Sequence, residues 1–526
     1  MRDPAVRDLV VVGAGHNALV AACYLARDGL DVEVVERDSI AGGAVSTVER
    51  FPGYRMDRGS SAHVMVRHTG IVEDLRLAEC GLAYQDLDPW GYAPFPDGSG
   101  VTFWVDVDRT CASIESVCGG RDADAYQAYV ADWGDRNARV FEAFQHPPTL
   151  RHLGRTLWGV GRGTGLPGIE LARQFLQPAD ALLDATFADE RLKTALAWLG
   201  AQSGPPTHEV ATADLVGWNT MLHRRAPGHP VGGSGRLAEA LVDRLRSYGA
   251  ALRLDDGAVQ ISTDDARATG VLTASGEHLR ARAVLAGCHI LTTLELLGDA
   301  ALLAAARRRI RVGNGIGMVV RLATTDLPRY PGAGPEAHRA LQLIAPSRAF
   351  LRRAYGDFAA GSPPRDPAVV AMTFSAFDDT IAPPGRHNVT VWGQWHPYRL
   401  ADGTGWDAIR EREGDKLVAA VERAAPGFAA SVEHAHVQTP LDLERELGLL
   451  GGNVMHLEMG LDAMFAWRPV PEWSAYRGPV PGLYLTGAST HPGGGVFGAS
   501  GRSAAHVVLR DLHGGPRRGR RRARSR

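Results

Sequence analysis

Lysine is nearly absent from this chain of 526 residues: it occurs only at positions 193 and 416, whereas arginine is abundant. That bias is typical of GC-rich coding and carries little functional weight. The formal net charge of −2 lacks the basic excess of nucleic-acid-binding proteins, so no nucleic-acid partner is expected. Basic residues are concentrated only in 517–526, which hold seven arginines, and we expect 514–526 to be a disordered basic tail.

Paired cysteines and long apolar runs are missing too. The five cysteines include no CxxC pair, which predicts neither a redox disulfide nor a metal site, and favours reduced thiols in a cytoplasmic protein. No apolar run reaches about 18 residues, so no transmembrane helix is expected. The first predicted strand begins within a few residues of Met1, which leaves no room for a signal peptide.

A glycine turn follows an apolar run near the start of the chain. Leu9–Val12 is typical of a buried strand, and the turn after it precedes a helix expected at about 17–28. Glycines there permit a tight turn and let the backbone approach a pyrophosphate, which the helix N-terminus would hold. The residues expected to contact a dinucleotide are Gly13, Gly15, His16, Asn17 and Ala18.

The next predicted strand ends in an acid. Glu36 stands 21 positions after Gly15, where a carboxylate accepts hydrogen bonds from ribose hydroxyls and repels a 2′-phosphate. NADP is therefore disfavoured. The pair Gly42-Gly43 follows, and here the chain resembles the glutathione-reductase-like FAD-binding superfamily, in which such a pair approaches the phosphates. Ala44 stands where that superfamily often has arginine, so Arg37 or Arg50 is expected to neutralise phosphate.

Glycine-rich segments recur in the middle and near the end of the chain. Residues 230–237 precede an amphipathic helix, and Val259 follows in a strand expected to lie near the adenine. Residues 491–495 form a loop with few side chains, before a helix expected from about residue 497 whose N-terminus would face a flavin. Expected flavin contacts in this block are Gly487, Gly494, Gly495 and Val496.

Three motifs at 13–17, 451–459 and 487–496 together resemble the phytoene-desaturase-like FAD oxidoreductases, in the branch that includes carotene-ketolase-type proteins. The likeness runs from about residue 8 to 513. It implies FAD as cofactor and an α/β fold: a discontinuous, glutathione-reductase-like Rossmann domain with an inserted α+β substrate domain of antiparallel sheet and helices. The expected boundaries are 1–105, 225–295 and 445–513 for the FAD-binding domain, and 106–224 and 296–444 for the substrate domain.

Few side chains are candidates for catalysis. His456 is expected either to face the isoalloxazine or to stabilise its loop, and His491 either to hold the flavin loop or to act as an acid or base. Trp392, Trp395 and His396 are candidates for an apolar substrate wall, although a plain core strand explains them equally well. In this family the flavin itself carries the difficult step, so a protein base is not required.

The sequence therefore predicts an FAD-dependent oxidoreductase that dehydrogenates a hydrophobic or polycyclic small molecule, by hydride transfer to flavin N5 with reoxidation by oxygen or a quinone. Ketolase-type oxygenation, redox-neutral isomerisation and a non-catalytic FAD-stabilised binding protein stay open as alternatives. Residues 149–176 mix apolar and arginine side chains, so they fit either a membrane-contacting helix or, as their glycines and Pro167 favour, an interrupted surface segment. The oligomeric state is not predicted.

Overall fold

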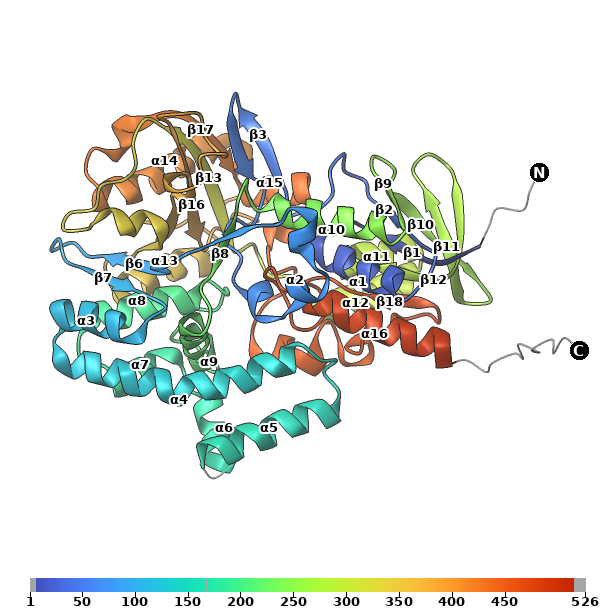
Figure 1. The fold of residues 1–526 in the computed structure, drawn as a ribbon, viewed down its shortest axis with the longest axis horizontal. Helices are drawn as coiled ribbons and strands as arrows, with labels where there is room; N and C mark the ends of the chain where they lie inside the picture. Colours follow the sequence, from blue (N-terminus) through green and yellow to red (C-terminus); the bar gives the residue numbers. More distant parts are fainter. Residues whose placement is uncertain (1–5, 166–167, 515–526) are drawn as a thin grey trace, which may run out of the picture.

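The computed structural model describes residues 6–165 and 168–514. Within that part of the chain, two seven-stranded sheets organise two lobes that lie side by side (Figure 1). The predicted tail of 514–526 lies outside the described residues except for Gly514, which ends the last helix. Among the described residues, no helix combines the length and the apolar character that spanning a bilayer requires.

The first sheet is assembled from three distant stretches of chain. Its parallel core has the order β9-β2-β1-β12-β18, and an antiparallel hairpin of β10 and β11 continues from β12. Leu9–Val12 is wholly buried, as expected for a parallel strand covered on both faces. The predicted discontinuous Rossmann domain is confirmed. The strands are β1 (Arg7–Val12), β2 (Val32–Val35), β9 (Ala251–Arg253), β10 (Ala258–Asp264), β11 (Arg267–Thr273), β12 (His278–Ala286) and β18 (Leu483–Leu485).

Helices from both ends of the chain pack on this sheet. A Cβ on Gly501 would lie 2.1 Å from the carbonyl oxygen of Asn17, so the first and last helices touch backbone to backbone. This contact brings the 487–497 loop to the N-terminal glycine turn. The helices of this lobe are α1 (His16–Arg27), α2 (Ile71–Asp74), α10 (Gly235–Ser247), α11 (Ile290–Leu297), α12 (Ala300–Arg309) and α16 (Ala499–Gly514).

The second sheet has the order β17-β13-β16-β15-β14-β6-β7 and is antiparallel except where β14 pairs with β6. Along β16, Val389 and Val391 pack under α14, whereas Thr390 and Trp392 face the interlobe cavity. The strands are β6 (Gly91–Pro94), β7 (Gly100–Phe103), β13 (Gly317–Thr324), β14 (Leu341–Ile344), β15 (Val369–Met372), β16 (His387–Gln394) and β17 (Val432–Gln438).

Helices surround the second sheet, and two of them project as a separate tip at the bottom of Figure 1. That tip consists of α5 (Leu150–Thr164) and α6 (Gly168–Leu176). The other helices are α3 (Val107–Cys118), α4 (Gly120–Phe144), α7 (Ala179–Thr186), α8 (Glu190–Ala201), α9 (Ala213–Gly217), α13 (Arg348–Ala359), α14 (Trp406–Ala424) and α15 (Pro440–Leu447). Two small ribbons complete the fold: β3 (Thr47–Phe51) with β4 (Tyr54–Asp57), and β5 (Tyr84–Asp86) with β8 (Gly228–Pro230).

Two expected domain boundaries need correction. Residues 91–103, assigned from sequence to the FAD-binding domain, form β6 and β7 and extend the second sheet beside β14. Residues 296–309, assigned to the substrate domain, complete α11 and form α12, and Ala306 packs into the core under the first sheet. Both errors have one cause: strand pairing and helix packing across long sequence distances decide which lobe a short segment joins.

Candidate active site

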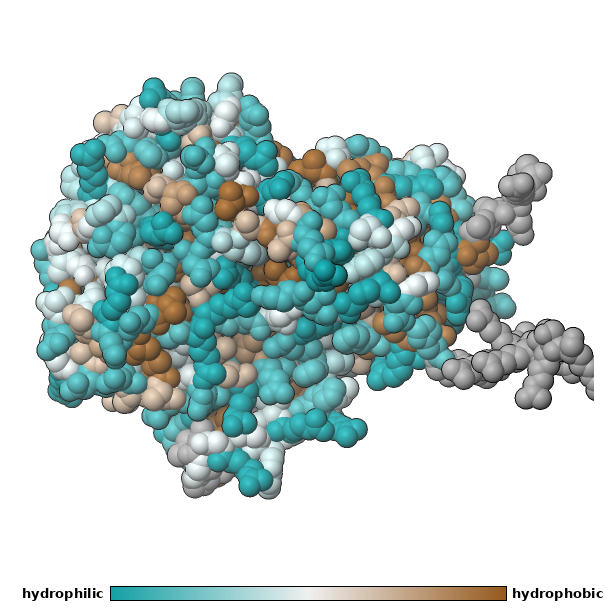
Figure 2. Space-filling model, viewed as in Figure 1, coloured by the Kyte–Doolittle hydropathy of each residue, from teal (hydrophilic) through white to brown (hydrophobic). Residues whose placement is uncertain are grey.

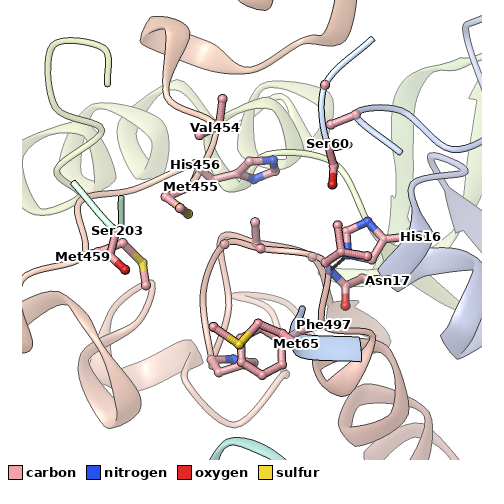
Figure 3. A pocket seen from close by; sticks show the side chains of 18 of the residues that line it. His16, Asn17, Ser60, Met65, Ser203, Val454, Met455, His456, Met459 and Phe497 are labelled. Atoms are coloured by element: carbon pink, nitrogen blue, oxygen red, sulfur yellow. Dashed lines mark hydrogen bonds between the residues drawn. The ribbon is translucent and has the colours of Figure 1, made fainter. Parts of the chain in front are cut away.

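One large cavity lies between the lobes. Its volume is about 1230 Å³, and residues of both lobes form its walls. In Figure 3, His16 and Asn17 lie on one side of it and Ser203 and Met459 on the opposite side, with His456 along a third wall. A single space therefore connects the predicted dinucleotide turn with the inserted domain.

The N-terminal turn has the geometry of a phosphate cradle. Gly13 adopts φ +91°, and its N–H donates to the Val35 carbonyl at 2.8 Å. A Cβ on Gly15 would meet no atom within 4 Å, so this backbone borders open space. No side chain caps α1, which leaves its first N–H groups directed at the cavity. Ala18 packs closely against Gly287, where a Cβ would approach it to 2.5 Å.

The acid and the glycine pair complete this cradle. Glu36 Oε2 accepts from the Ala14 N–H at 2.6 Å, so the carboxylate is held at the end of β2 and lines the cavity. The Gly42 N–H donates to the Ala14 carbonyl, and a Cβ on Gly42 would lie 2.2 Å from the Val45 carbonyl oxygen. Gly43 also lines the cavity. At Gly42, where φ is +115°, only glycine fits this second turn.

Of the two arginines expected near phosphate, the structure favours Arg37. Arg37 lines the cavity, whereas Arg50 lies outside it and forms an ion pair with Glu446 at 2.8 Å. Val259 is also misplaced by sequence reasoning, because its side chain is 52% exposed and does not reach the cavity. A register shift between Ala258 and Gln260 breaks the alternation of β10 there. Gly257 and Ala258 line the cavity instead.

The C-terminal loop lines the cavity through Gly487, Gly494, Gly495 and Val496. Gly487 and Gly495 have φ of +95° and +103°, which favour glycine. Gly494 differs: its φ is not positive, and a Cβ there would lie 2.4 Å from Met455 Sδ. A positive φ therefore does not explain this glycine. Crowding by Met455 explains it.

His456 points into the cavity (Figure 3). Its φ is +64°, and its Nδ1 lies 3.0 Å from Ser489 Oγ. The Leu291 N–H donates to His289 Nδ1, so His289 Nε2 carries a proton and donates to the His456 carbonyl at 3.1 Å. Burial lowers the pKa of His456 well below its ordinary value, so the imidazole is neutral at pH 7. A neutral, oriented ring at this position is a weak base, because the same burial disfavours its protonated form.

His491 does not line the cavity. It is buried, its Nε2 lies 3.2 Å from the Ala143 carbonyl, and its ring packs against Phe144 and Phe465. Burial lowers its pKa to about 4. Since the ring packs against α4 and Phe465 and does not line the cavity, we interpret His491 as a loop anchor and not as an acid or base.

Among the predicted substrate-wall residues, only Trp392 lines the cavity. The Trp395 Nε1–H donates to the Gly204 carbonyl at 2.8 Å, and His396 is buried against the Gly393 carbonyl. The strand ends at Gln394, and Trp395 adopts φ +62°, so strand alternation no longer governs these two side chains. The wall that the structure does provide is largely apolar, and includes Val140, Phe141, Leu153, Val160, Phe175, Leu199, Leu343 and Val370.

Sequence reasoning gave no role to Arg468, which is fully buried and has no carboxylate partner among the described residues. Its guanidinium donates to the carbonyls of Met455, Glu458, Ala463 and Ala488 at 2.6–3.2 Å, and burial lowers its pKa to about 9. One side chain thus joins the His456 loop to the C-terminal loop. An arginine followed by proline in an irregular segment carries no sequence signal for such a role.

Comparisons with known proteins agree with this geometry. Residues 11–75 match the family described as NAD(P)-binding Rossmann-like domain. Pyridine nucleotide-disulfide oxidoreductase domain-containing protein 2 of Rattus norvegicus is 34% identical, over 96% of this chain and 94% of that protein. Phytoene dehydrogenase of Streptomyces griseus is 27% identical, over 93% and 92%. The crystal structure of an oxidoreductase from Methanosarcina mazei shares the fold, with a TM-score of 0.64 at 15% identity, over 95% and 99%.

The glycine cradle fits FAD, since the backbone borders open space where a pyrophosphate would lie and Glu36 stands where the ribose would lie. The relatives support the same cofactor, and the protein is an FAD-dependent oxidoreductase. The chain belongs to the family of pyridine nucleotide-disulfide oxidoreductase domain-containing protein 2, within the phytoene-desaturase-like FAD oxidoreductases.

Proposed function

We propose that this oxidoreductase dehydrogenates a hydrophobic small molecule bound between the two lobes. The observation that carries the proposal is the continuity of one cavity: the FAD cradle opens directly onto the apolar wall of the inserted domain. Such a wall binds hydrocarbon by removing it from water and offers little to a charged substrate. The name of the Streptomyces griseus relative is consistent with this substrate class.

In this proposal, the residues of the chain position substrate and cofactor. The cradle at 13–18 holds the pyrophosphate, and α16 directs its N-terminus toward the loop that contacts the flavin. Bound FAD supplies a hydride acceptor at N5. His456 is oriented by Ser489 to receive the proton that the substrate loses, and the apolar wall excludes water from the reacting carbons. We infer oxygen or a quinone as the final electron acceptor.

Anaerobic reduction of the flavin tests the proposal. Holoprotein is mixed with a panel of terpenoid, polyene and polycyclic compounds, flavin absorbance is followed, and products are analysed by mass spectrometry after air is admitted. The expected result is bleaching of the flavin by a member of the panel and a product that has lost two hydrogens. A product of unchanged mass would indicate isomerisation, and one with added oxygen would indicate ketolase-type chemistry. Either product would contradict dehydrogenation.

A further inference from the structure

Methionine side chains are concentrated around the cavity. Six of the eight methionines in the described residues line it, and they come from segments far apart in the sequence: Met65, Met221, Met372, Met455, Met459 and Met464. In Figure 3, Met65 lies on a different side of the space from Met455 and Met459. The other two, Met56 and Met318, are fully buried and do not line the cavity. Methionine therefore marks this cavity and not the core in general.

Strand alternation directs Met372 into the cavity. Along β15, Val370 and Met372 line the cavity, whereas Val369 and Ala371 pack in the core under α14. Thr390, which pairs with Met372 in the register of β15 and β16, lines the cavity as well. Met372 thus belongs to the face of the second sheet that forms part of the cavity wall.

Met459 borders the same space from the irregular segment after His456. Figure 3 shows its side chain beside Ser203, across the cavity from His16 and Asn17. A Cβ on Gly493 would lie 2.9 Å from Met459 Sδ, so the glycine leaves room for the thioether. A methionine therefore contributes to the wall on this side too.

Methionine changes its shape more readily than branched apolar side chains do. It is unbranched, with three rotatable bonds and a polarisable sulfur, so it fills irregular gaps and packs again around a different ligand. Valine and isoleucine are held in few χ1 rotamers by their branched Cβ. A wall rich in methionine therefore follows the outline of its ligand, whereas a wall of stiff side chains selects one outline.

Polar side chains also line the cavity, but they do not select among hydrocarbons. The polar lining includes Asn137, Thr156, Gln202, Ser203 and Thr390. A hydrocarbon has no donor or acceptor for these groups, so its affinity depends on the apolar area that it buries and on its fit to the wall. Shape is thus the property on which a hydrocarbon ligand would be accepted or rejected.

We propose that the methionines make this cavity adaptable, so that the enzyme accepts hydrophobic substrates of similar size whose skeletons differ in shape, from open chains to fused rings. Met372 and Met459 are specificity-determining residues in this sense, because their flexibility widens the range of skeletons that fit. This inference rests on the proposed function, since it describes the substrate range of the same cavity.

Equilibrium binding to holoprotein tests the adaptable cavity without requiring turnover. The probes are farnesene, bisabolene, valencene and cedrene, which are isomeric hydrocarbons with no ring, one ring, two rings and three rings. Binding is measured by calorimetry and by the change in flavin absorbance. Wild-type protein is expected to bind all four with dissociation constants within about tenfold of one another.

Stiffening the wall should narrow this range. Met372→Ile and Met459→Ile keep an apolar side chain of similar size but restrict its rotamers, so each should weaken at least one isomer about tenfold or more and leave the best-fitting isomer unchanged. Met318→Ile is the matched control, because it makes the same change on the face of the second sheet that packs under α14. It should alter no affinity. FAD content and thermal unfolding of each variant distinguish altered fit from lost folding.

Several outcomes would overturn the proposal: binding of none of the isomers, wild-type affinities that differ by more than about tenfold, or cavity variants in which all four affinities change equally or not at all. The result is separable from the proposed function. Similar binding of all four isomers by a protein whose flavin no panel compound reduces would keep the adaptable cavity and reject dehydrogenation. Dehydrogenation of a panel compound by a protein that binds one isomer selectively would do the reverse.

Discussion

Gly15 and Gly494 both border the cavity, but for opposite physical reasons. At Gly15 the space beyond Cα is open, and its φ of −65° suits any residue. At Gly494 the space is already filled, since a Cβ would lie 2.5 Å from Met455 Cα. The first glycine therefore serves a ligand, and the second serves the packing of two loops.

Substituting these two glycines should separate cofactor binding from folding. Gly15→Val places a branched side chain where the pyrophosphate would lie, so FAD per chain should fall at least about tenfold while the apoprotein unfolds at a nearly unchanged temperature. Gly494→Val should lower the unfolding temperature of the apoprotein itself. FAD released on denaturation and calorimetry of apoprotein provide the two measurements. A destabilised Gly15→Val apoprotein would contradict this assignment.

Substituting the two candidate histidines, His456 and His491, should likewise separate an effect on turnover from an effect on folding. His456→Ala removes a neutral, oriented imidazole from the cavity, so turnover should fall about 10²-fold or more, the usual contribution of a general base, with FAD content near wild type. His491→Ala removes a buried ring packed against Phe144 and Phe465, so it should lower stability by about 2 kcal/mol or more and leave turnover per bound FAD unchanged. The check is kcat per bound FAD together with thermal unfolding. Unchanged turnover in His456→Ala would mean that no protein base is needed.

At the scale of elements, a buried hydrogen bond connects the lobes. Asp378 follows β15 of the second sheet and lies 2.8 Å from His229 Nε2 on β8. The same carboxylate accepts from the Gly232 N–H at 2.8 Å and from Thr380. The Asp378 carboxylate therefore fixes the turn before α10 relative to the second sheet. Because both lobes border the cavity, this contact also fixes two of the cavity's walls relative to each other.

This connection predicts an acid dependence of stability. Burial by itself would raise the pKa of Asp378, but hydrogen bonding to His229, Thr380 and Gly232 outweighs burial and lowers the pKa from 3.8 to about 2. A lowered carboxyl pKa contributes stability above pH 3.8, about 2 kcal/mol here, and that contribution is lost as pH falls toward 2. Asp378→Asn should unfold at lower temperature at pH 7 and show a smaller further loss between pH 4 and pH 2. If the unfolding temperatures of the variant and the wild type fell in parallel between pH 4 and pH 2, the lowered pKa of Asp378 would be contradicted.

At the scale of the whole molecule, the projecting tip of α5 and α6 is the part through which contact with a membrane can be tested. The visible surface is mostly hydrophilic with separate hydrophobic patches, and the tip itself is white to teal (Figure 2). Among its described side chains, the exposed large apolar ones are Trp158 at 68%, Ile169 at 84% and Leu176 at 56%. The inner face of α5 and α6 lines the cavity, so such a contact would bring the cavity close to the membrane.

Peripheral membrane contact stays a prediction that vesicle sedimentation checks. Wild-type protein should co-sediment with vesicles of phosphatidylcholine and phosphatidylglycerol more than with phosphatidylcholine alone, since arginines accompany the apolar residues of the tip. Trp158→Ser with Ile169→Ser should reduce binding severalfold without changing FAD content. Val259→Ser, at a similarly exposed apolar residue on the other lobe, serves as control. Equal sedimentation of all variants would exclude a role for the tip.

Electron flow is also a property of the whole molecule. The sequence contains one convincing dinucleotide motif, and we propose that FAD occupies the site that this motif forms. NADH and NADPH should therefore reduce the bound flavin slowly or not at all, whereas dithionite reduces it at once. Anaerobic stopped-flow absorbance measures both. Rapid bleaching by either nicotinamide would show a second nucleotide site.

Sequence alone was enough to predict the geometry of the cofactor cradle, because the conformations of its residues depend on their neighbours in the chain. Gly13 needs a positive φ, Gly15 needs open space, and Glu36 must end the strand after the first helix, and all three requirements act over short stretches of chain. The resemblance of the motifs at both chain ends predicted the discontinuous Rossmann domain and the family, and the comparisons confirm both.

Only the tertiary structure decided which side chains face the cavity. Trp392 lines it and Trp395 does not, because β16 ends between them. His491 is turned into aromatic packing by helix α4, and Arg468 joins two loops through carbonyl groups that no pattern of side chains reveals. Local conformation is encoded in neighbouring residues, whereas burial and pairing depend on segments hundreds of positions apart, which meet only in the folded chain.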